Sequence, residues 1–311
     1  MKRRTFNELL LGTTTMAYLG TNISDLYASN IKKVRLGGPV FDKSDDPESW
    51  IMYLKKAGYR AAYCPVQPGS DQHTVNAYRS AAEKNDIVIS EVGAWSNMVS
   101  PDENERKKSI EKCIKGLVLA DQIGANCCVN VSGSRNPEHW AGPHQDNLTQ
   151  DTFDLIVETA RQIIDAVNPS DTYFTLEAMP WAYPDSPENY VKLIKAINRK
   201  RFGVHIDPVN MVVSPQLYFK NGELIKLCFK MLGPYVRSCH AKDITLREDN
   251  YIPQLDELRP GLGKLNYQVY LSELAELEDI PLMMEHLTTE EEYVAAANYI
   301  RSVGQKINIE V

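Results

Sequence analysis

The chain has 311 residues, which is enough for one complete α/β barrel and too few for two large domains. Its formal net charge of −7 argues against nucleic acid or another polyanion as a partner. No apolar run reaches the roughly 20 residues that a membrane-spanning helix needs, so we expect no membrane span.

The first 30 residues differ in composition from the rest of the chain. A basic start that contains the pair Arg3-Arg4 precedes a short apolar stretch from Leu9 to Gly20. This order is typical of an export signal, and the arginine pair resembles a twin-arginine signal, which directs folded proteins across a membrane. We therefore predict a signal-like segment, residues 1–30, a folded domain, residues 31–311, and a periplasmic location. A tail on a cytoplasmic protein is the alternative.

Beyond residue 30, short β-rich runs alternate with longer amphipathic segments. We predict eight strands, over residues 34–36, 60–66, 87–92, 126–131, 173–178, 202–207, 236–242 and 282–286. We predict eight helices, near residues 47–57, 74–84, 103–123, 151–167, 187–199, 222–232, 266–278 and 289–303. Several strands are almost continuously apolar, as expected for strands that are covered on both faces.

Strict alternation of eight strands and eight helices predicts an α/β fold, a single (β/α)8 TIM barrel with parallel strands and outer helices. A doubly wound open sheet is the alternative. It is disfavoured because residues 37–39, which read GGP after the first strand, lack the spacing of a dinucleotide-binding loop.

Residues that favour helix ends stand near several predicted boundaries. Asp102 and Ser186 precede helices and belong to the types that accept hydrogen bonds from a first helical turn. Gly58, Gly124 and Gly233 fall near helix ends, where we expect a left-handed backbone conformation.

Four consecutive predicted strands end in an ionisable residue. These residues are Glu177, Asp207, His240 and Glu285, and the carboxyl ends of barrel strands meet at one mouth. Converging carboxylates are costly to bury unless a cation lies between them. The sequence therefore predicts one bound divalent cation, and the oxygen-rich donor set with one nitrogen favours Mn²⁺, with Mg²⁺, Co²⁺ or Zn²⁺ as alternatives. Separate buried polar groups, each with its own partner, are the other interpretation.

These strand endings, together with residues 260–267, which read PGLGKLNY, resemble the xylose-isomerase-like superfamily of sugar phosphate isomerases and epimerases. The most specific part of the resemblance is the series Glu, Asp-x-x-Asn/His, His and Glu on strands five to eight. It implies that the four strand-end residues bind the metal. From the ketose 3-epimerases of this superfamily, it also implies that Glu177 and Glu285 are catalytic and exchange a proton of the substrate carbon.

The same superfamily contains metal-dependent endonucleases that act on damaged DNA and carry two further metals. In this chain, Asn210 stands where those enzymes have a histidine, three residues after the aspartate of strand six. The ends of the second and third predicted strands also lack a histidine. A three-metal cluster therefore cannot be assembled, and the acidic charge disfavours DNA as well.

Five residues near the strand ends are candidates for substrate contact: His205, Asn210, Lys242, Arg247 and Trp181. The histidine and the lysine stand two residues from a predicted ligand, so they should point to the same side of their strands. The asparagine belongs to the Asp-x-x-Asn element, and the arginine lies in the loop after the seventh strand. Packing in the barrel, a structural ion pair and simple exposure are the alternatives for the histidine, the lysine and the arginine.

Aromatic residues follow the middle strands. Trp95, Trp140 and Trp181 come after strands three, four and five, and aromatic rings stack on the apolar face of a pyranose. Packing explains a tryptophan equally well, and we single out Trp181 because it follows Glu177 by four residues. Glu91, at the end of the third strand, is a further candidate for the barrel mouth.

One cation with a carboxylate on each side suits proton transfer next to a carbonyl, through an enediolate. We therefore expect an isomerase or epimerase that acts on a free or oxidised sugar, a small carbohydrate without phosphate. A lyase or hydratase acting on a keto-sugar glycoside is one alternative, since a leaving group β to the acidic carbon would be eliminated. A non-catalytic periplasmic sugar-binding barrel is another. Related barrels often pair, which favours a homodimer.

Overall fold

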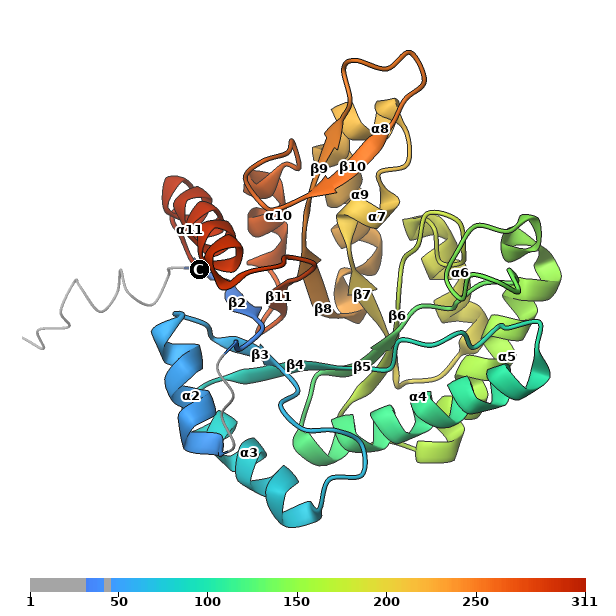
Figure 1. Ribbon diagram of the computed structural model, residues 1–311, viewed down its shortest axis with the longest axis horizontal. Helices are drawn as coiled ribbons and strands as arrows, with labels where there is room; N and C mark the ends of the chain where they lie inside the picture. Colours follow the sequence, from blue (N-terminus) through green and yellow to red (C-terminus); the bar gives the residue numbers. More distant parts are fainter. Residues whose placement is uncertain (1–31, 42–45) are drawn as a thin grey trace, which may run out of the picture. The chain divides into compact units, whose positions relative to one another are not determined.

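The computed structural model describes residues 32–41 and 46–311, so the predicted export signal lies outside the described residues. Eight parallel strands close into a barrel in the order β11-β2-β3-β4-β5-β6-β7-β8 (Figure 1). They are β2 (Arg35–Gly38), β3 (Ala61–Tyr63), β4 (Val88–Gly93), β5 (Cys127–Asn130), β6 (Tyr173–Glu177), β7 (Phe202–Ile206), β8 (Val236–Ala241) and β11 (Pro281–Met284). The predicted (β/α)8 TIM barrel is confirmed.

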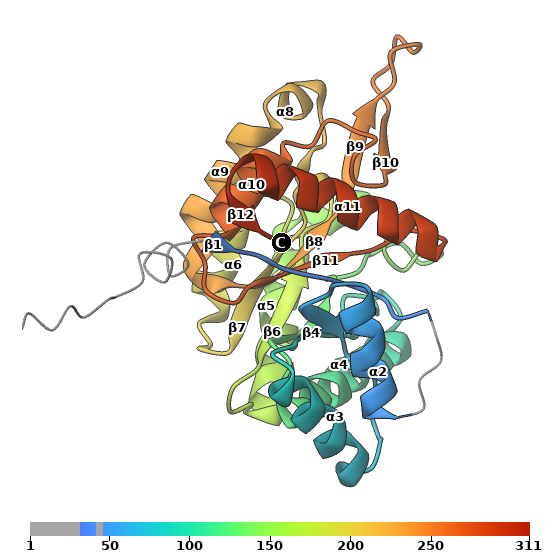
Figure 2. The same ribbon diagram turned by 90° about the vertical axis from the view of Figure 1, so that its left-hand side faces the viewer.

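A long helix follows each barrel strand and covers the outside of the barrel (Figures 1 and 2). These helices are α2 (Pro47–Lys56), α3 (Gln72–Lys84), α4 (Glu103–Ile123), α5 (Gln150–Val167), α6 (Pro187–Ile197), α9 (Asn221–Leu232), α10 (Tyr267–Leu274) and α11 (Glu290–Lys306). Every predicted helix is present. In the part of the chain that the structure describes, no helix is long and apolar enough to cross a bilayer.

Several short elements were not predicted. They are β1 (Lys32–Lys33), η1 (Gln145–Leu148), α7 (Pro208–Met211), α8 (Pro215–Phe219), η2 (Gly233–Tyr235), β9 (Asp243–Leu246), β10 (Leu255–Leu258) and β12 (Ile309–Glu310). The strands β9 and β10 form an antiparallel hairpin that projects from the barrel after β8. The strands β1 and β12 pair in parallel, so the two ends of the described barrel lie side by side.

The helix ends agree with the sequence patterns in four of five cases. The side chain of Asp102 accepts hydrogen bonds from the first turn of α4, and that of Ser186 accepts one from the first turn of α6. Gly58 and Gly124 adopt positive φ angles of 69° and 76°. The prediction for Gly233 was wrong, because its φ is −42° and the chain continues from α9 directly into η2.

The barrel interior and the layer beneath the helices form one continuous hydrophobic core. Every residue of β5 and β7 is buried, as expected for strands that are covered on both faces. The buried strands hold their carboxyl ends in fixed positions. Polar side chains at those ends therefore project from a rigid base.

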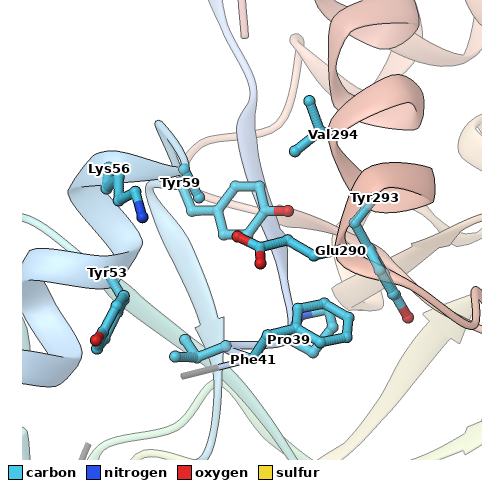
Figure 3. Close-up of a pocket in the computed structure, with 10 residues that line it drawn as sticks. Pro39, Phe41, Tyr53, Lys56, Tyr59, Glu290, Tyr293 and Val294 are labelled. Atoms are coloured by element: carbon cyan, nitrogen blue, oxygen red, sulfur yellow. The ribbon is translucent and has the colours of Figure 1, made fainter. Parts of the chain in front are cut away.

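A small hollow of about 150 Å³ lies between the segment before α2 and helix α11 (Figure 3). Its described lining is mostly apolar and aromatic, with Lys56 and Glu290 as the charged side chains. This hollow contains no group of converging carboxylates and imidazoles among its described lining residues. The chemistry of the molecule is concentrated at the barrel mouth instead.

Candidate metal centre

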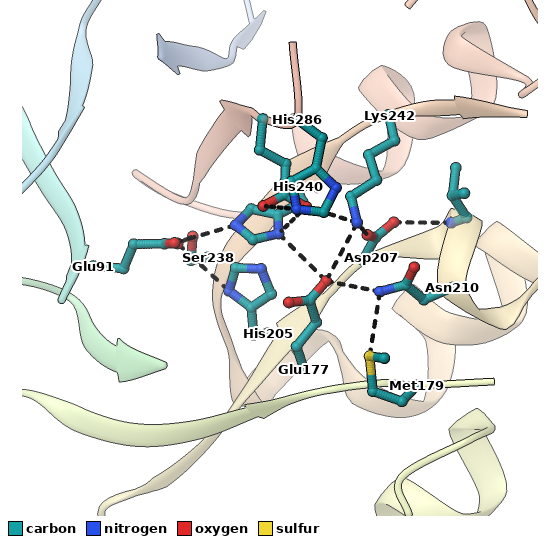
Figure 4. Close-up of polar contacts among 12 residues, drawn as sticks. Glu91, Glu177, Met179, His205, Asp207, Asn210, Ser238, His240, Lys242 and His286 are labelled. Atoms are coloured by element: carbon teal, nitrogen blue, oxygen red, sulfur yellow. Dashed lines mark hydrogen bonds and ion pairs between the residues drawn. The ribbon is translucent and has the colours of Figure 1, made fainter. Parts of the chain in front are cut away.

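The four predicted ligands come together at the carboxyl ends of β6, β7, β8 and β11. Figure 4 shows three of them, Glu177, Asp207 and His240. One donor atom from each of Glu177, Asp207, His240 and Glu285 lies within 4.8 Å of the others. The Nδ1 atom of His240 lies 3.4 Å from Glu177 Oε1 and 2.9 Å from Glu285 Oε1. The first three residues are buried, and the side chain of Glu285 is 12% exposed. The cluster therefore opens to solvent on the Glu285 side.

Strand register explains why these residues meet. Glu177 ends β6 and pairs with His205 of β7, two residues before Asp207. His240 of β8 pairs with Met283 of β11, two residues before Glu285. Side chains two residues apart in a strand point to the same side, so the parallel pairing turns all four donor groups toward the barrel interior.

Glu91 fixes the orientation of the imidazole. Its Oε1 lies 3.1 Å from His240 Nε2, and its Oε2 accepts a hydrogen bond of 2.7 Å from Ser238. Burial acts to raise the pKa of Glu91, but His240 and the hydrogen bond from Ser238 outweigh that effect and lower the pKa, so Glu91 is ionised. An ionised carboxylate only accepts, so Nε2 must donate, and Nδ1 is the nitrogen that faces the other carboxylates. A histidine ligand held by a carboxylate in this way is usual at metal sites.

Lys242 is the cation nearest to the cluster in the described part of the chain. Its Nζ lies 2.7 Å from Glu285 Oε1, 2.8 Å from Asp207 Oδ2 and 3.8 Å from Glu177 Oε1. Burial lowers the pKa of this lysine, but Asp207, Glu177 and Glu285 outweigh it and raise the pKa. Lys242 therefore remains charged.

The charges leave room for a divalent cation. With His240 neutral as a ligand, three carboxylates face one lysine, which leaves two negative charges to neutralise. Among the described residues, the buried atoms Asp207 Oδ2 and Glu285 Oε1 accept no regular hydrogen bond, although they form ion pairs with Lys242 at 2.8 and 2.7 Å. Buried oxygens with unused lone pairs fit a hard divalent cation.

The two glutamates differ in their protonation. Burial raises the pKa of Glu177 to about 7, although His240 opposes this shift. Burial also acts to raise the pKa of Glu285, but His240 and Lys242 outweigh it and hold that pKa well below its usual range. Without a cation, the two identical side chains thus hold a proton with different strength.

A cavity of about 620 Å³ lies over this cluster. Three of the predicted substrate contacts, Asn210, Lys242 and Trp181, line it, as do both glutamates. The amide of Asn210 donates a hydrogen bond of 2.8 Å to Glu177 Oε1. Asn210 therefore fixes the position of this carboxyl group.

Two predicted contacts lie away from the cavity lining. His205 is completely buried beside His240, with ring centroids 4.0 Å apart, and its two ring nitrogens have no hydrogen-bond partner among the described residues. Burial lowers the pKa of His205 to about 3, so this ring is neutral. Arg247 lies in the β9–β10 hairpin and pairs with Asp256. This placement agrees with the packing role for His205 and the exposed role for Arg247.

Among the lining residues that the sequence analysis missed, one is a carboxylate and one is an imidazole. Glu257 of β10 contacts Lys242 at 3.5 Å and binds the Nδ1 of His286 at 2.9 Å. His286 has a positive φ of 59°, an uncommon conformation for a side-chain-bearing residue. His286 directly follows the predicted ligand Glu285 in the sequence, and this position could have marked His286 as a candidate for the cavity. Glu257 has no such signal, because the unpredicted hairpin brings it to the cavity.

The stretch 260–267, which carries part of the family resemblance, supports the site from outside the cavity. Oδ2 of the buried Asp243 accepts hydrogen bonds from the backbone of Gly261 and Gly263, at 2.9 and 3.0 Å. A Cβ atom on Gly263 would lie 2.4 Å from Asp243 Oδ1, so this position requires glycine. The stretch anchors the chain that follows β8, close to His240 and Lys242.

Residues 51–303 match the model of a family described as "Xylose isomerase-like TIM barrel". Among curated proteins, none matches this chain.

Solved structures share the fold at low identity. A xylose isomerase-like TIM barrel protein from Mycobacterium smegmatis in complex with magnesium is 17% identical, with a TM-score of 0.62 over 89% of this chain and 96% of that one. D-psicose 3-epimerase from Clostridium cellulolyticum H10, solved with D-tagatose, is 16% identical, with a TM-score of 0.63 over 87% and 99%. Endonuclease IV from Thermus thermophilus is 15% identical, with a TM-score of 0.66 over 88% and 99%. These similarities show the fold, which is shared by proteins of different activity.

Proposed function

The chain belongs to the xylose isomerase-like TIM barrel family, and on this premise we propose that it is a divalent-metal-dependent sugar isomerase or epimerase. The observation that carries the proposal is the pair Glu177 and Glu285. Both carboxyl groups belong to one four-donor cluster, both line the cavity, and their pKa values are shifted in opposite directions. A binding protein that performs no chemistry has no need for such a pair.

Glu177, Asp207, His240 and Glu285 would hold the cation, and Mn²⁺ is our first candidate because the donor set has three carboxylates and one imidazole. A bound divalent cation would supply Lewis acidity toward the oxygens of a hydroxy-ketone. Glu91 supports this arrangement, because it keeps the Nε2 proton of His240 on the side away from the carboxylates.

The residues of the chain suit proton transfer next to a carbonyl. Glu285, the carboxylate with the lowered pKa, would remove a proton from the sugar carbon. Glu177, with its raised pKa, would return a proton, and Asn210 orients its carboxyl group. The two roles exchange in the reverse reaction. Lys242 would place a fixed positive charge beside the negative charge that develops on the substrate.

A lyase or hydratase acting on a keto-sugar glycoside is a second candidate. It would begin with the same proton removal by Glu285, followed by loss of a group from the next carbon. The observation that favours it is the size of the cavity, about 620 Å³, which leaves room for a leaving group attached to the reacting sugar. Release of an aglycone from a keto-glycoside would distinguish this activity from epimerisation.

We also propose that the protein is exported and acts on an unphosphorylated carbohydrate. The basic and apolar composition of residues 1–30 supports export. Cell fractionation of the wild type and of an Arg3→Lys, Arg4→Lys double variant tests this proposal. Retention of the variant in the cytoplasm is expected, and unchanged location would contradict twin-arginine export.

The central proposal is tested by metal content and by isotope exchange. We expect about one divalent ion per chain and transfer of deuterium from solvent into a ketose, such as D-fructose or D-tagatose, in the presence of Mn²⁺. Glu177→Gln and Glu285→Gln should abolish exchange, whereas the exposed control Glu248→Gln should not. No metal under any loading condition, or exchange that persists in both glutamine variants, would overturn the proposal.

A further inference from the structure

On the basis of the proposed sugar function, we infer that the cavity binds a glycoside of two rings. The reacting sugar would lie over the metal centre, and the second ring would lie against Trp140 and Trp181. Both tryptophans line the same cavity as Glu177 and Glu285, but neither belongs to the four-donor cluster. They therefore form a part of the cavity that the proposed proton transfer does not use.

The size of the cavity supports a ligand larger than one sugar ring. Its volume of about 620 Å³ falls within the range of about 300 to 1,000 Å³ that encloses drug-sized ligands. A free monosaccharide has about half the atoms of a disaccharide and would leave much of this space to water. A second ring would fill it.

The cavity has two chemically different ends. The polar end carries Lys242, Glu257 and His286 together with the two glutamates. The apolar end is formed by the segments after β5 and β6, which contribute Val131, Trp140, Ala141, Pro180 and Trp181, whereas Met179 lies beside Asn210 near the polar end. The third tryptophan of the lining, Trp95, lies next to the polar end, with its ring centroid 6.3 Å from that of His240. Trp95 is thus placed beside the reacting sugar, whereas the other two belong to the apolar end.

The apolar end is held in place before any ligand binds. The indole Nε1 of Trp181 donates a hydrogen bond of 2.7 Å to the carbonyl of Ala141, which joins the two segments. Asn147 donates a hydrogen bond of 3.0 Å to the carbonyl of Gly142, directly after Ala141. The amide of Gly142 donates to the carbonyl of His139 at 3.1 Å and closes a turn around Trp140. A rigid aromatic surface costs little ordering when it binds a ring.

The exposure of the tryptophans indicates a ligand. Trp140 is 49% exposed and Trp181 is 37% exposed, although full burial of such side chains would stabilise the fold. Apolar surface gathered in one cavity marks a binding site more often than a packing defect. The flat indole faces suit the C–H face of a second pyranose, or a flat aglycone, which presents the same apolar surface.

Calorimetric titration of the Mn²⁺-loaded full chain tests this inference with matched probes. Methyl β-D-glucoside presents one ring, whereas cellobiose, maltose and phenyl β-D-glucoside each add a second one. We expect at least one two-ring probe to bind roughly tenfold more tightly than the methyl glucoside. The phenyl compound distinguishes a preference for an aromatic aglycone from a preference for a second sugar. Equal affinity for one-ring and two-ring probes would overturn the inference.

Variants locate the second ring. Trp140→Ala and Trp181→Ala should lower the ratio of two-ring to one-ring affinity by roughly two- to tenfold each. Trp140→Phe should keep most of that ratio because an aromatic face remains, which guards against an alanine variant that fails to fold. Tyr251→Ala, an exposed aromatic at the hairpin tip, is the matched control and should leave the ratio unchanged. An unchanged ratio in both alanine variants would contradict the placement.

The test of the second-ring site can fail or succeed independently of the test of the proposed isomerase activity. Glu177→Gln should remove isotope exchange and retain the preference for two rings, because Glu177 lies at the polar end. A preference for two rings without any exchange in the wild type would support the second-ring site and contradict the isomerase. Isotope exchange on monosaccharides without a preference for two rings would support the isomerase and contradict the second-ring site.

Discussion

The floor and the rim of the cavity are built in different ways. The floor consists of Glu177, Asp207, His240 and Glu285, which stand at the ends of four buried parallel strands. The rim consists of groups on connecting segments, such as Glu257 on the β9–β10 hairpin and the tryptophans after β4, β5 and β6. The floor gains its geometry from the barrel itself, whereas the rim depends on local hydrogen bonds between segments. We therefore expect changes in the floor to abolish chemistry and changes in the rim to tune affinity.

Removal of a floor ligand should have the largest effect. In His240→Ala, the cluster loses its nitrogen donor, and we expect the metal content to fall from about one ion per chain toward none. Isotope exchange should fall by roughly a hundredfold to ten-thousandfold, the usual contribution of correctly placed acid–base groups. Metal analysis by mass spectrometry and proton exchange by NMR measure the two effects. His73→Ala, an exposed histidine on α3, is the control.

Replacement of the group beneath the floor should have the next largest effect. In Glu91→Gln, the carboxylate that fixes the Nε2 proton of His240 is lost, although the side chain keeps its size. We expect metal affinity to fall by roughly 10- to 100-fold, as for other partners of metal-bound histidines. Competition with a fluorescent chelator measures this affinity. Equal affinities in Glu91→Gln and in the surface control Glu111→Gln would show that Glu91 has only a packing role.

The floor was more predictable from sequence than the rim. An apolar run marks each strand in the sequence. A charged residue at the carboxyl end of such a run is expected to lie at the barrel mouth. The position of Glu177 and His240 at the barrel mouth was therefore predictable from the neighbouring residues in the sequence. The position of Glu257 was not predictable, because β9 and β10 are short and lack a clear alternation of apolar residues. In addition, β10 is partly exposed.

Two other predictions, for His205 and Gly233, differ from the structure because they depend on features that a local sequence pattern does not specify. His205 stands two residues before Asp207 and faces the same side of β7. It is nevertheless completely buried and does not line the cavity, because the spacing along one strand does not specify how deep a side chain lies in the barrel. Gly233 follows a helix, yet η2 begins there and needs a right-handed backbone. Sequence patterns specify which side a residue faces and where an element ends, but not depth or the start of a short neighbouring turn.

The floor should also make metal binding depend on pH. Burial raises the pKa of Glu177 to about 7 in the metal-free protein, so a proton competes with the cation below that pH. Metal affinity should therefore fall as the pH drops below about 7, by up to roughly tenfold per pH unit for one displaced proton. The raised pKa of His240 adds to the effect in the same direction. Chelator competition between about pH 5.5 and about 8 measures it, and a flat profile would contradict the assignment of Glu177 as a ligand.

The smallest effect on the metal should come from the rim. In Glu257→Gln, His286 loses the negatively charged acceptor whose hydrogen bond is the main cause of its raised pKa, so we expect this pKa to fall toward its ordinary value. Metal affinity should change by less than about threefold, because Glu257 is partly exposed and contacts Lys242 at 3.5 Å rather than the four ligands. NMR titration of the His286 imidazole measures the first effect, and chelator competition measures the second. If Glu257→Gln weakened metal binding as strongly as Glu91→Gln, the rim would be part of the electrostatic balance that holds the cation, and the distinction between rim and floor would fail.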